Sequence, residues 1–219
     1  MKKFYLFMLM AVGLLISGNL RAGEVKNLAA LREALSKGGE ITLGADINVN
    51  MEQSDQILWV ESDATLDLNG HTIKGSTTID MPTAGVLNVQ NTANLTLKAT
   101  NGGSVVVNET SAATQAIYSL GGLTIEGGYY FGTDLGIYIA KEEGKNSQGT
   151  TLIKGDTHVE AVGRAIYCGV GKSGDQWKIG TITIEGNPTF ESRTKEGLYP
   201  GLAVVNVYGG TFKSVTETR

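Results

Sequence analysis

The sequence contains few of the residues that cross-link small exported domains or interrupt β-sheets. Its 219 residues include a single cysteine, Cys168, and three prolines, against thirty glycines. One cysteine excludes an intramolecular disulfide framework, and the alternation in Ala165-Ile-Tyr-Cys168 predicts an inert thiol buried in a strand. Few prolines and many glycines are typical of a chain that turns often while keeping its backbone N–H groups free for hydrogen-bonded ladders.

A long apolar run occurs only at the start of the chain. Lys2 and Lys3 precede an almost unbroken apolar stretch from Phe4 to Ile16, and polar residues then lead to the small residue Ala22. This pattern predicts a signal peptide over residues 1–22, too short to be a stable membrane span. We expect an exported protein, extracellular, on the cell surface or periplasmic, with no membrane span in the mature chain.

The sequence also lacks an excess of positive charge. Removing Lys2, Lys3 and Arg21 from the 18 basic residues leaves 15, against 22 acidic residues in the mature chain. Binding of nucleic acid requires a clustered basic surface. The sequence therefore argues against a nucleic-acid partner.

One short phrase recurs along most of the chain. Leu123-Thr-Ile-Glu-Gly-Gly returns in Ile182-Thr-Ile-Glu-Gly and, more loosely, in Val205-Asn-Val-Tyr-Gly-Gly. Including weaker copies, the phrase begins at residues 41, 66, 95, 123, 151, 182 and 205. Repeats at such a period indicate a solenoid, in which each turn buries its apolar face only against its neighbours.

The chain divides into a leader, a short cap and the repeats. In Leu28 to Ser36, three leucines lie on one face of a helix that Gly38 and Gly39 end. We expect residues 23–39 to form an N-terminal capping helix region and residues 40–219 to form the repeats. Each repeat contains three short alternating strands joined by glycine-rich corners, which predicts an all-β parallel solenoid of about seven turns.

The combined pattern resembles a known superfamily. The helical cap, Gly38-Gly-Glu-Ile-Thr-Leu43, Asp67-Leu-Asn-Gly-His-Thr-Ile73 and the repeated Gly-Gly phrase are similar to pectate-lyase-like right-handed parallel β-helices, over roughly residues 24–213. The resemblance implies the fold, and it includes bacterial secreted and surface (adhesin-like) proteins as well as polysaccharide lyases and hydrolases.

The catalytic motifs that the superfamily's enzymes carry are not found in this sequence. We therefore expect no catalytic residue, metal site or cofactor, and a non-catalytic module for cell-surface adhesion or for binding a glycan or protein. The alternative is a small or degenerate lyase acting on an acidic polysaccharide. Its candidate residues would be Arg164 or Lys172 and the early aspartates Asp46, Asp55, Asp63, Asp67 and Asp80.

A row of tyrosines is the candidate ligand-binding feature. Tyr118, Tyr138 and Tyr167 recur in Ala/Gly-Ile-Tyr, and two long insertions follow the second and third of these strands. Exposed phenol rings can pack against sugar rings, and Trp177 in the second insertion would add an aromatic contact. The alternative is that the tyrosines form a packing ladder without a ligand.

The last repeat predicts an interaction between molecules. After Val205-Asn-Val-Tyr-Gly-Gly-Thr-Phe212 the sequence offers only Val215 to cover an apolar cross-section. An uncovered solenoid end exposes edge strands that pair with other chains. Either the last seven residues fold across this end, or two molecules meet there, or the chain belongs to a longer protein; we expect an open end that associates end to end with another molecule or once continued.

Overall fold

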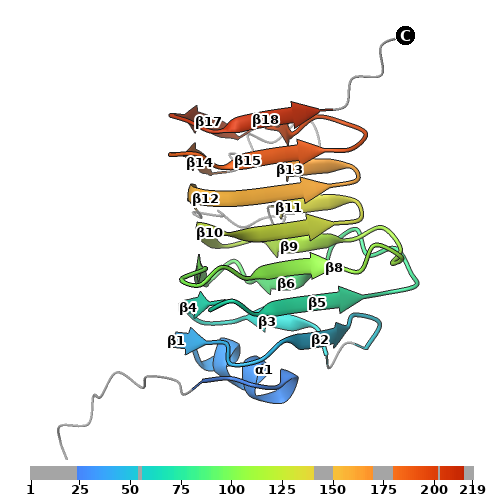
Figure 1. The fold of residues 1–219 in the computed structure, drawn as a ribbon, viewed down its shortest axis with the longest axis vertical. Coiled ribbons are helices and arrows are strands. Elements are labelled where there is room, and N and C mark those ends of the chain that lie inside the picture. The colour runs from blue at the N-terminus through green and yellow to red at the C-terminus, as the bar shows by residue number, and fades with distance from the viewer. Residues whose placement is uncertain (1–23, 54–55, 141–149, 170–179, 202, 215–219) are drawn as a thin grey trace, which may run out of the picture.

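The computed structural model describes residues 24–53, 56–140, 150–169, 180–201 and 203–214, which form one helix and eighteen strands. The strands wind into a parallel β-solenoid with α1 at its N-terminal end (Figure 1). In this view one series of strands crosses the near face from left to right, and each turn lies above the last, so the coil is right-handed. The expected fold class is confirmed. The expected signal peptide lies outside the described residues.

Helix α1 (Leu28–Lys37) covers the first turn, as expected. The side chain of Asn27 caps the helix by accepting a 3.0 Å hydrogen bond from the backbone N–H of Ala30. Gly38, with a φ of 77°, ends it. Leu31 and Leu35 are completely buried, so the apolar face of α1 closes the core at this end.

Three columns of strands make up the solenoid. The first column has seven members stacked in parallel. They are β1 (Gly39–Thr42), β4 (Ala64–Asp67), β7 (Asn94–Lys98), the first half of β10 (Gly122–Gly132), the first half of β12 (Thr151–Ala161), β14 (Thr181–Ile184) and β17 (Val204–Val207).

The second column continues from the first around a glycine corner. It contains β2 (Ile47–Asn50), β5 (Thr72–Ser76), β8 (Ser104–Val107), the second halves of β10 and β12, β15 (Thr189–Ser192) and β18 (Thr211–Ser214). Strand β10 passes through the corner at Gly127 and Gly128, both with a φ of 95°, a conformation that glycine adopts without strain.

The third column forms a separate six-stranded sheet. Its members are β3 (Leu58–Val60), β6 (Gly85–Val89), β9 (Gln115–Ser119), β11 (Leu135–Ile139), β13 (Arg164–Cys168) and β16 (Leu198–Tyr199). The final turn, with β17 and β18, has no third-column strand among the described residues. The complete turns are therefore fewer than the seven expected.

The core consists of aliphatic stacks that the repeat phrase predicts. Ile125, Ile153 and Ile184 lie in register in the first column and are completely buried. Cys168 is also buried, as expected. No helix in the described part of the chain has the length and apolar character needed to cross a membrane.

One register in the repeat alignment is wrong. Leu66 lies opposite Leu97, and Ala64 lies opposite Leu95. The second copy of the phrase is therefore shifted by two residues relative to the third copy, which begins at Leu95. A shift of two keeps every side chain on the same face of a strand. The error therefore left the set of core residues correct. It placed Asp67 opposite Thr96, whereas in the structure Thr65 lies opposite Thr96 and Asp67 lies opposite Lys98.

Candidate functional site

The outer face of the second column carries a polar surface. In β5, Ile73 and Gly75 are buried, while Thr72, Lys74 and Ser76 alternate with them and lie on the solvent side. The neighbouring strand β2 presents Asn48 and Asn50 to solvent in the same way. Because the strands are parallel and in register, these side chains form rows across adjacent turns.

Three adjoining hollows follow this surface, with volumes of about 370, 350 and 530 Å³. Asn108, in the segment after β8, lines all three, and Lys74 lines the first and the third. The shared lining residues make the hollows parts of one depression, here called the second-column groove. Volumes of this size are in the range of small-molecule and single-sugar sites.

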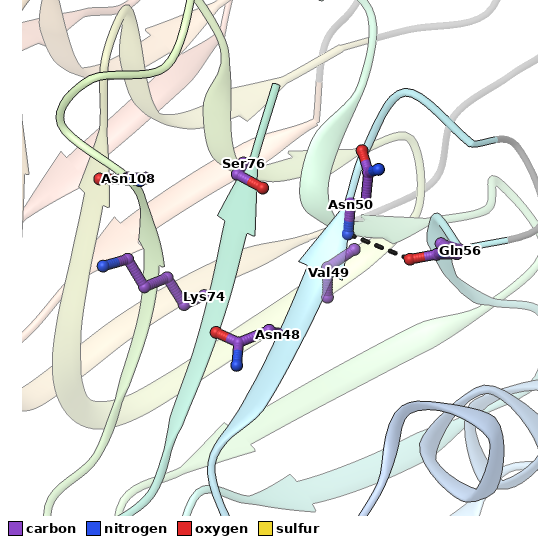
Figure 2. A pocket seen from close by; sticks show the side chains of 7 residues that line it. All are labelled: Asn48, Val49, Asn50, Gln56, Lys74, Ser76 and Asn108. Atoms are coloured by element: carbon purple, nitrogen blue, oxygen red, sulfur yellow. Dashed lines mark hydrogen bonds between the residues drawn. The ribbon is translucent and has the colours of Figure 1, made fainter. Parts of the chain in front are cut away.

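Amides and hydroxyls dominate the lower part of the groove. Figure 2 shows Asn48, Asn50 and Lys74 projecting from two neighbouring strands, with Gln56 at one side. Gln56 accepts a 3.3 Å hydrogen bond from the backbone N–H of Asn50 through its side-chain oxygen (Figure 2). These groups can donate to and accept from a ligand rich in hydroxyl groups.

Lys74 is an exposed cation in the middle of the groove. Within the described residues its ammonium group forms no ion pair, whereas the nearby acids are engaged. Glu52 accepts a 2.5 Å hydrogen bond from the backbone N–H of Thr78, and hydrogen bonds from the side chain and then the backbone of Thr78 lower the pKa of its carboxyl. Glu109 pairs with Arg193 at 3.2 Å.

Two aromatic residues close the upper end of the groove. Tyr129 and Phe131 both line the largest hollow, on the second half of β10. The structure pairs Phe131 with Glu160 and pairs Tyr130 with Val159. The register shifts at the corner, since Glu126 pairs with Lys154 but Gly128 with Thr157, so β10 has one residue fewer there than β12 and its faces reverse.

At the aromatic end of the groove, side chains from four separate segments form a hydrogen-bonded network. Glu160 on β12 accepts hydrogen bonds from Tyr129 Oη at 2.8 Å and from Arg193 Nε at 2.7 Å. Arg193 also reaches Glu109, 84 residues away in sequence. Its guanidinium carbon lies 4.9 Å from the centre of the Phe131 ring. Sequence reasoning missed this network because no local pattern joins its members.

The network sets the protonation states of Glu160 and Tyr129. Burial tends to raise the pKa of Glu160, but the hydrogen bonds from Tyr129 and Arg193 outweigh it and the pKa is lowered. Burial, and then the bond to Glu160, raises the pKa of the Tyr129 hydroxyl. At neutral pH the arrangement is therefore a carboxylate held by a neutral phenol and a guanidinium.

The predicted tyrosine row lies on the third column. Tyr118, Tyr138 and Tyr167 are in register, with ring centroids 5.2 Å apart at each step. The structure adds a fourth member, Tyr199, 5.3 Å from Tyr167. Sequence reasoning missed it because Gly-Leu-Tyr199 departs from the Ala/Gly-Ile-Tyr phrase. Trp177 and the main part of both insertions lie outside the described residues.

The tyrosines contact one another through ring faces and edges. Tyr118 and Tyr138 meet at an interplanar angle of 81°, and Tyr167 and Tyr199 are stacked at 18°. Tyr118 is only 9% exposed. Arg164, 4.7 Å from the Tyr199 ring centre, extends the stack and pairs with Glu196. This geometry favours a packing ladder, and the binding of a ligand to the row stays a prediction.

The early aspartates accept hydrogen bonds at the corners of the solenoid. Asp46, Asp63 and Asp80 accept hydrogen bonds from backbone N–H groups one turn further on, at Thr72, Asn94 and Ala113. Asp67 does the same for Thr100. Within the described residues, no three His, Cys, Asp or Glu side chains are grouped to hold a metal ion. Asp55 and Lys172 lie outside those residues.

Comparisons with known proteins gave no relative. No model of a protein family matches the sequence, and neither does a curated protein or a solved structure.

Proposed function

We propose that the protein is an exported, non-catalytic β-helix module that binds an extended glycan in the second-column groove. The observation that carries the proposal is the continuity of three hollows along adjacent turns, with Asn108 lining each one. Amides and hydroxyls in rows suit the hydroxyl groups of a saccharide, and Tyr129 at one end offers an aromatic contact.

The direction of the groove supports a chain-like ligand. Its lining residues come from β2, β5, β8 and β10, which are successive members of the second column. Neighbouring strands are spaced by about 4.8 Å, which is close to the length of a sugar ring. A saccharide lying along the solenoid axis would therefore meet one set of polar groups per turn.

The resemblance to pectate-lyase-like proteins leaves a degenerate lyase as the alternative, with less support. The carboxylates of Asp46, Asp63 and Asp67 already accept backbone hydrogen bonds at corners. The guanidinium of Arg164 is committed to Glu196 and two tyrosine rings. Incubation with acidic polysaccharides and Ca²⁺ tests this alternative, and sustained growth of ultraviolet absorbance from an unsaturated product would favour it over the module.

A glycan array probed with residues 23–219 tests the binding proposal. We expect Asn108→Ala to weaken binding of the best array ligand between about three- and tenfold, because one or two hydrogen bonds are lost. Lys154→Ala, on the first column, is the matched control and should leave affinity unchanged. If binding is instead lost in Tyr138→Ala and preserved in Asn108→Ala, the ligand lies on the tyrosine row.

Self-association through the last turn is a second element of the proposal. On β17 and β18 and the residues beside them, several apolar side chains are exposed, among them Val204 at 61%, Tyr208 at 73% and Phe212 at 41%. Two copies could pair these edges about a twofold axis. Sedimentation velocity over a range of concentrations tests this: Phe212→Lys should shift any dimer to monomer, and a monomer at every concentration would refute it.

A further inference from the structure

The upper end of the groove contains an apolar surface that side chains cover. Phe131 faces outward from β10, yet only 3% of it is exposed. Its neighbours in the same outward row are more open, since Val106 and Glu160 are half-buried and Lys74 is exposed. The shielding of Phe131 is therefore local.

Arg193 lies over Phe131, 4.9 Å from its ring centre. Nη2 of its guanidinium lies 2.7 Å from Oε1 of Glu160 and 3.2 Å from Oε1 of Glu109. We call Arg193 with these two carboxylates the Arg193 lid. The side chains of Arg193 and Glu109 are 43% and 69% exposed, so the outer ion pair lies in water, where such pairs stabilise weakly.

Hydrogen bonds hold the backbone on both sides of the lid. The segment that carries Glu109 is fixed by hydrogen bonds from Asn108 to Gly75 and from Ala112 to Thr77, at 2.8 and 3.1 Å. The backbone N–H of Arg193 is bonded to Ala161 at 2.9 Å. With the backbone held in this way, opening of the lid would consist of rotation of the long side chains of Arg193 and Glu109, with release of the Arg193–Glu160 pair.

We propose that Phe131 is a stacking subsite for a pyranose ring, and that the Arg193 lid covers it until a glycan occupies the groove. The proposal rests on the proposed glycan-binding function. The occupant is a sugar ring because the subsite continues the polar groove, whose largest hollow Phe131 and Tyr129 both line. The apolar C–H face of the sugar would replace the guanidinium on the aromatic ring.

A first experiment tests the lid without any glycan. A Phe131→Trp variant reports on the subsite through quenching of its fluorescence by acrylamide, after subtraction of the signal of the chain without this substitution. We expect quenching to increase about twofold or more when Arg193→Ala is added, and to increase with NaCl as the ion pairs are screened. Quenching that is the same with and without Arg193→Ala overturns the lid.

A second experiment tests the subsite with cello-, xylo-, manno- and galacturono-hexasaccharides by titration calorimetry. Arg193→Ala should tighten binding of the best hexasaccharide about two- to fivefold, because an ion pair no longer has to be broken. Phe131→Leu, which keeps the apolar volume, should remove that gain. Lys213→Ala, which breaks the Lys213–Glu191 pair on the same face, is the control and should change nothing.

The two experiments separate the possible failures. Weaker binding in Arg193→Ala would make Arg193 a ligand contact and overturn the subsite, as would a gain in affinity that survives Phe131→Leu. If none of the four hexasaccharides nor any array glycan binds, the proposed function and the sugar occupant fail together. The quenching result then still decides whether the lid exists.

Discussion

The hydroxyl of Tyr129 donates a 2.8 Å hydrogen bond to Oε2 of Glu160, one turn further along the solenoid. The bond ties two adjacent turns on the outer face, where the second-column groove ends. Since the other oxygen of Glu160 accepts from Arg193, the carboxylate is held on both sides.

This geometry predicts a pH-dependent contribution to stability. The pKa of folded Glu160 lies below its ordinary value of 4.5, so its contribution is complete above that value and is lost as the pH falls through the folded pKa. At pH 7 we expect Glu160→Gln to lower the free energy of unfolding by about 1 kcal/mol. Urea unfolding at pH 7 and pH 3 measures the difference, which should shrink at pH 3. An equal difference at both values would contradict the assignment.

The tyrosine ladder predicts a stability effect at Tyr138. This ring contacts both Tyr118 and Tyr167 at 5.2 Å. Tyr138→Ala should destabilise the protein by about 1–3 kcal/mol, because the ring is half-buried and its removal leaves a gap between its neighbours. Tyr138→Phe keeps both ring contacts and serves as the control in thermal unfolding. If Tyr138→Ala does not change the melting temperature, the row does not stabilise the fold.

The corner aspartates predict a stability that is independent of Ca²⁺. Asp67 accepts hydrogen bonds from the backbone N–H groups of Asn69 and Thr100 and from the Thr100 hydroxyl. Asp67→Ala should cost about 1–2 kcal/mol, since one partly buried and one exposed backbone donor lose their partner. Excess EDTA should leave the melting temperature of the unmodified chain unchanged. A fall on adding EDTA that Ca²⁺ reverses would indicate a metal site at the corners.

The buried thiol predicts slow chemistry at Cys168. Burial raises the pKa of this thiol to about 12, and the thiolate is the reactive form. We expect no reaction with a disulfide reagent such as dithionitrobenzoate at pH 8 until the chain is unfolded in guanidinium. One equivalent of thiol should then react. Rapid labelling of the folded protein would show that β13 opens readily.

The sequence predicts the features that repeat and those that depend on near neighbours. Apolar residues such as Ile125 and Ile153 recur with the turn, so their burial in one column could be read from spacing. The helical cap was predictable because its leucines and its terminal Gly38 lie close together in the sequence. The row of three tyrosines was predictable for the same reason as the core.

The upper end of the groove could not be predicted in the same way. Phe131 faces outward because β10 has one residue fewer than β12 between Glu126 and Gly128, so its inward side changes from Ile125 to Tyr130, and a bulge leaves no reliable signal in a single sequence. Glu109 and Arg193 meet across three turns, and their pairing depends on side-chain reach. The upper end of the groove therefore consists largely of departures from the repeat, while the fold consists of the repeat itself.

The stacking of the turns also sets how the protein would respond to force. Backbone hydrogen bonds and corner carboxylates such as Asp67 join each turn only to its neighbours along the axis. A pull between the two ends would therefore act on these connections one after another, beginning at an end turn. We expect extension by optical tweezers to proceed in small successive steps of one turn each. Such a chain would lengthen gradually under tension while its remaining turns, and any ligand held by them, stay in place.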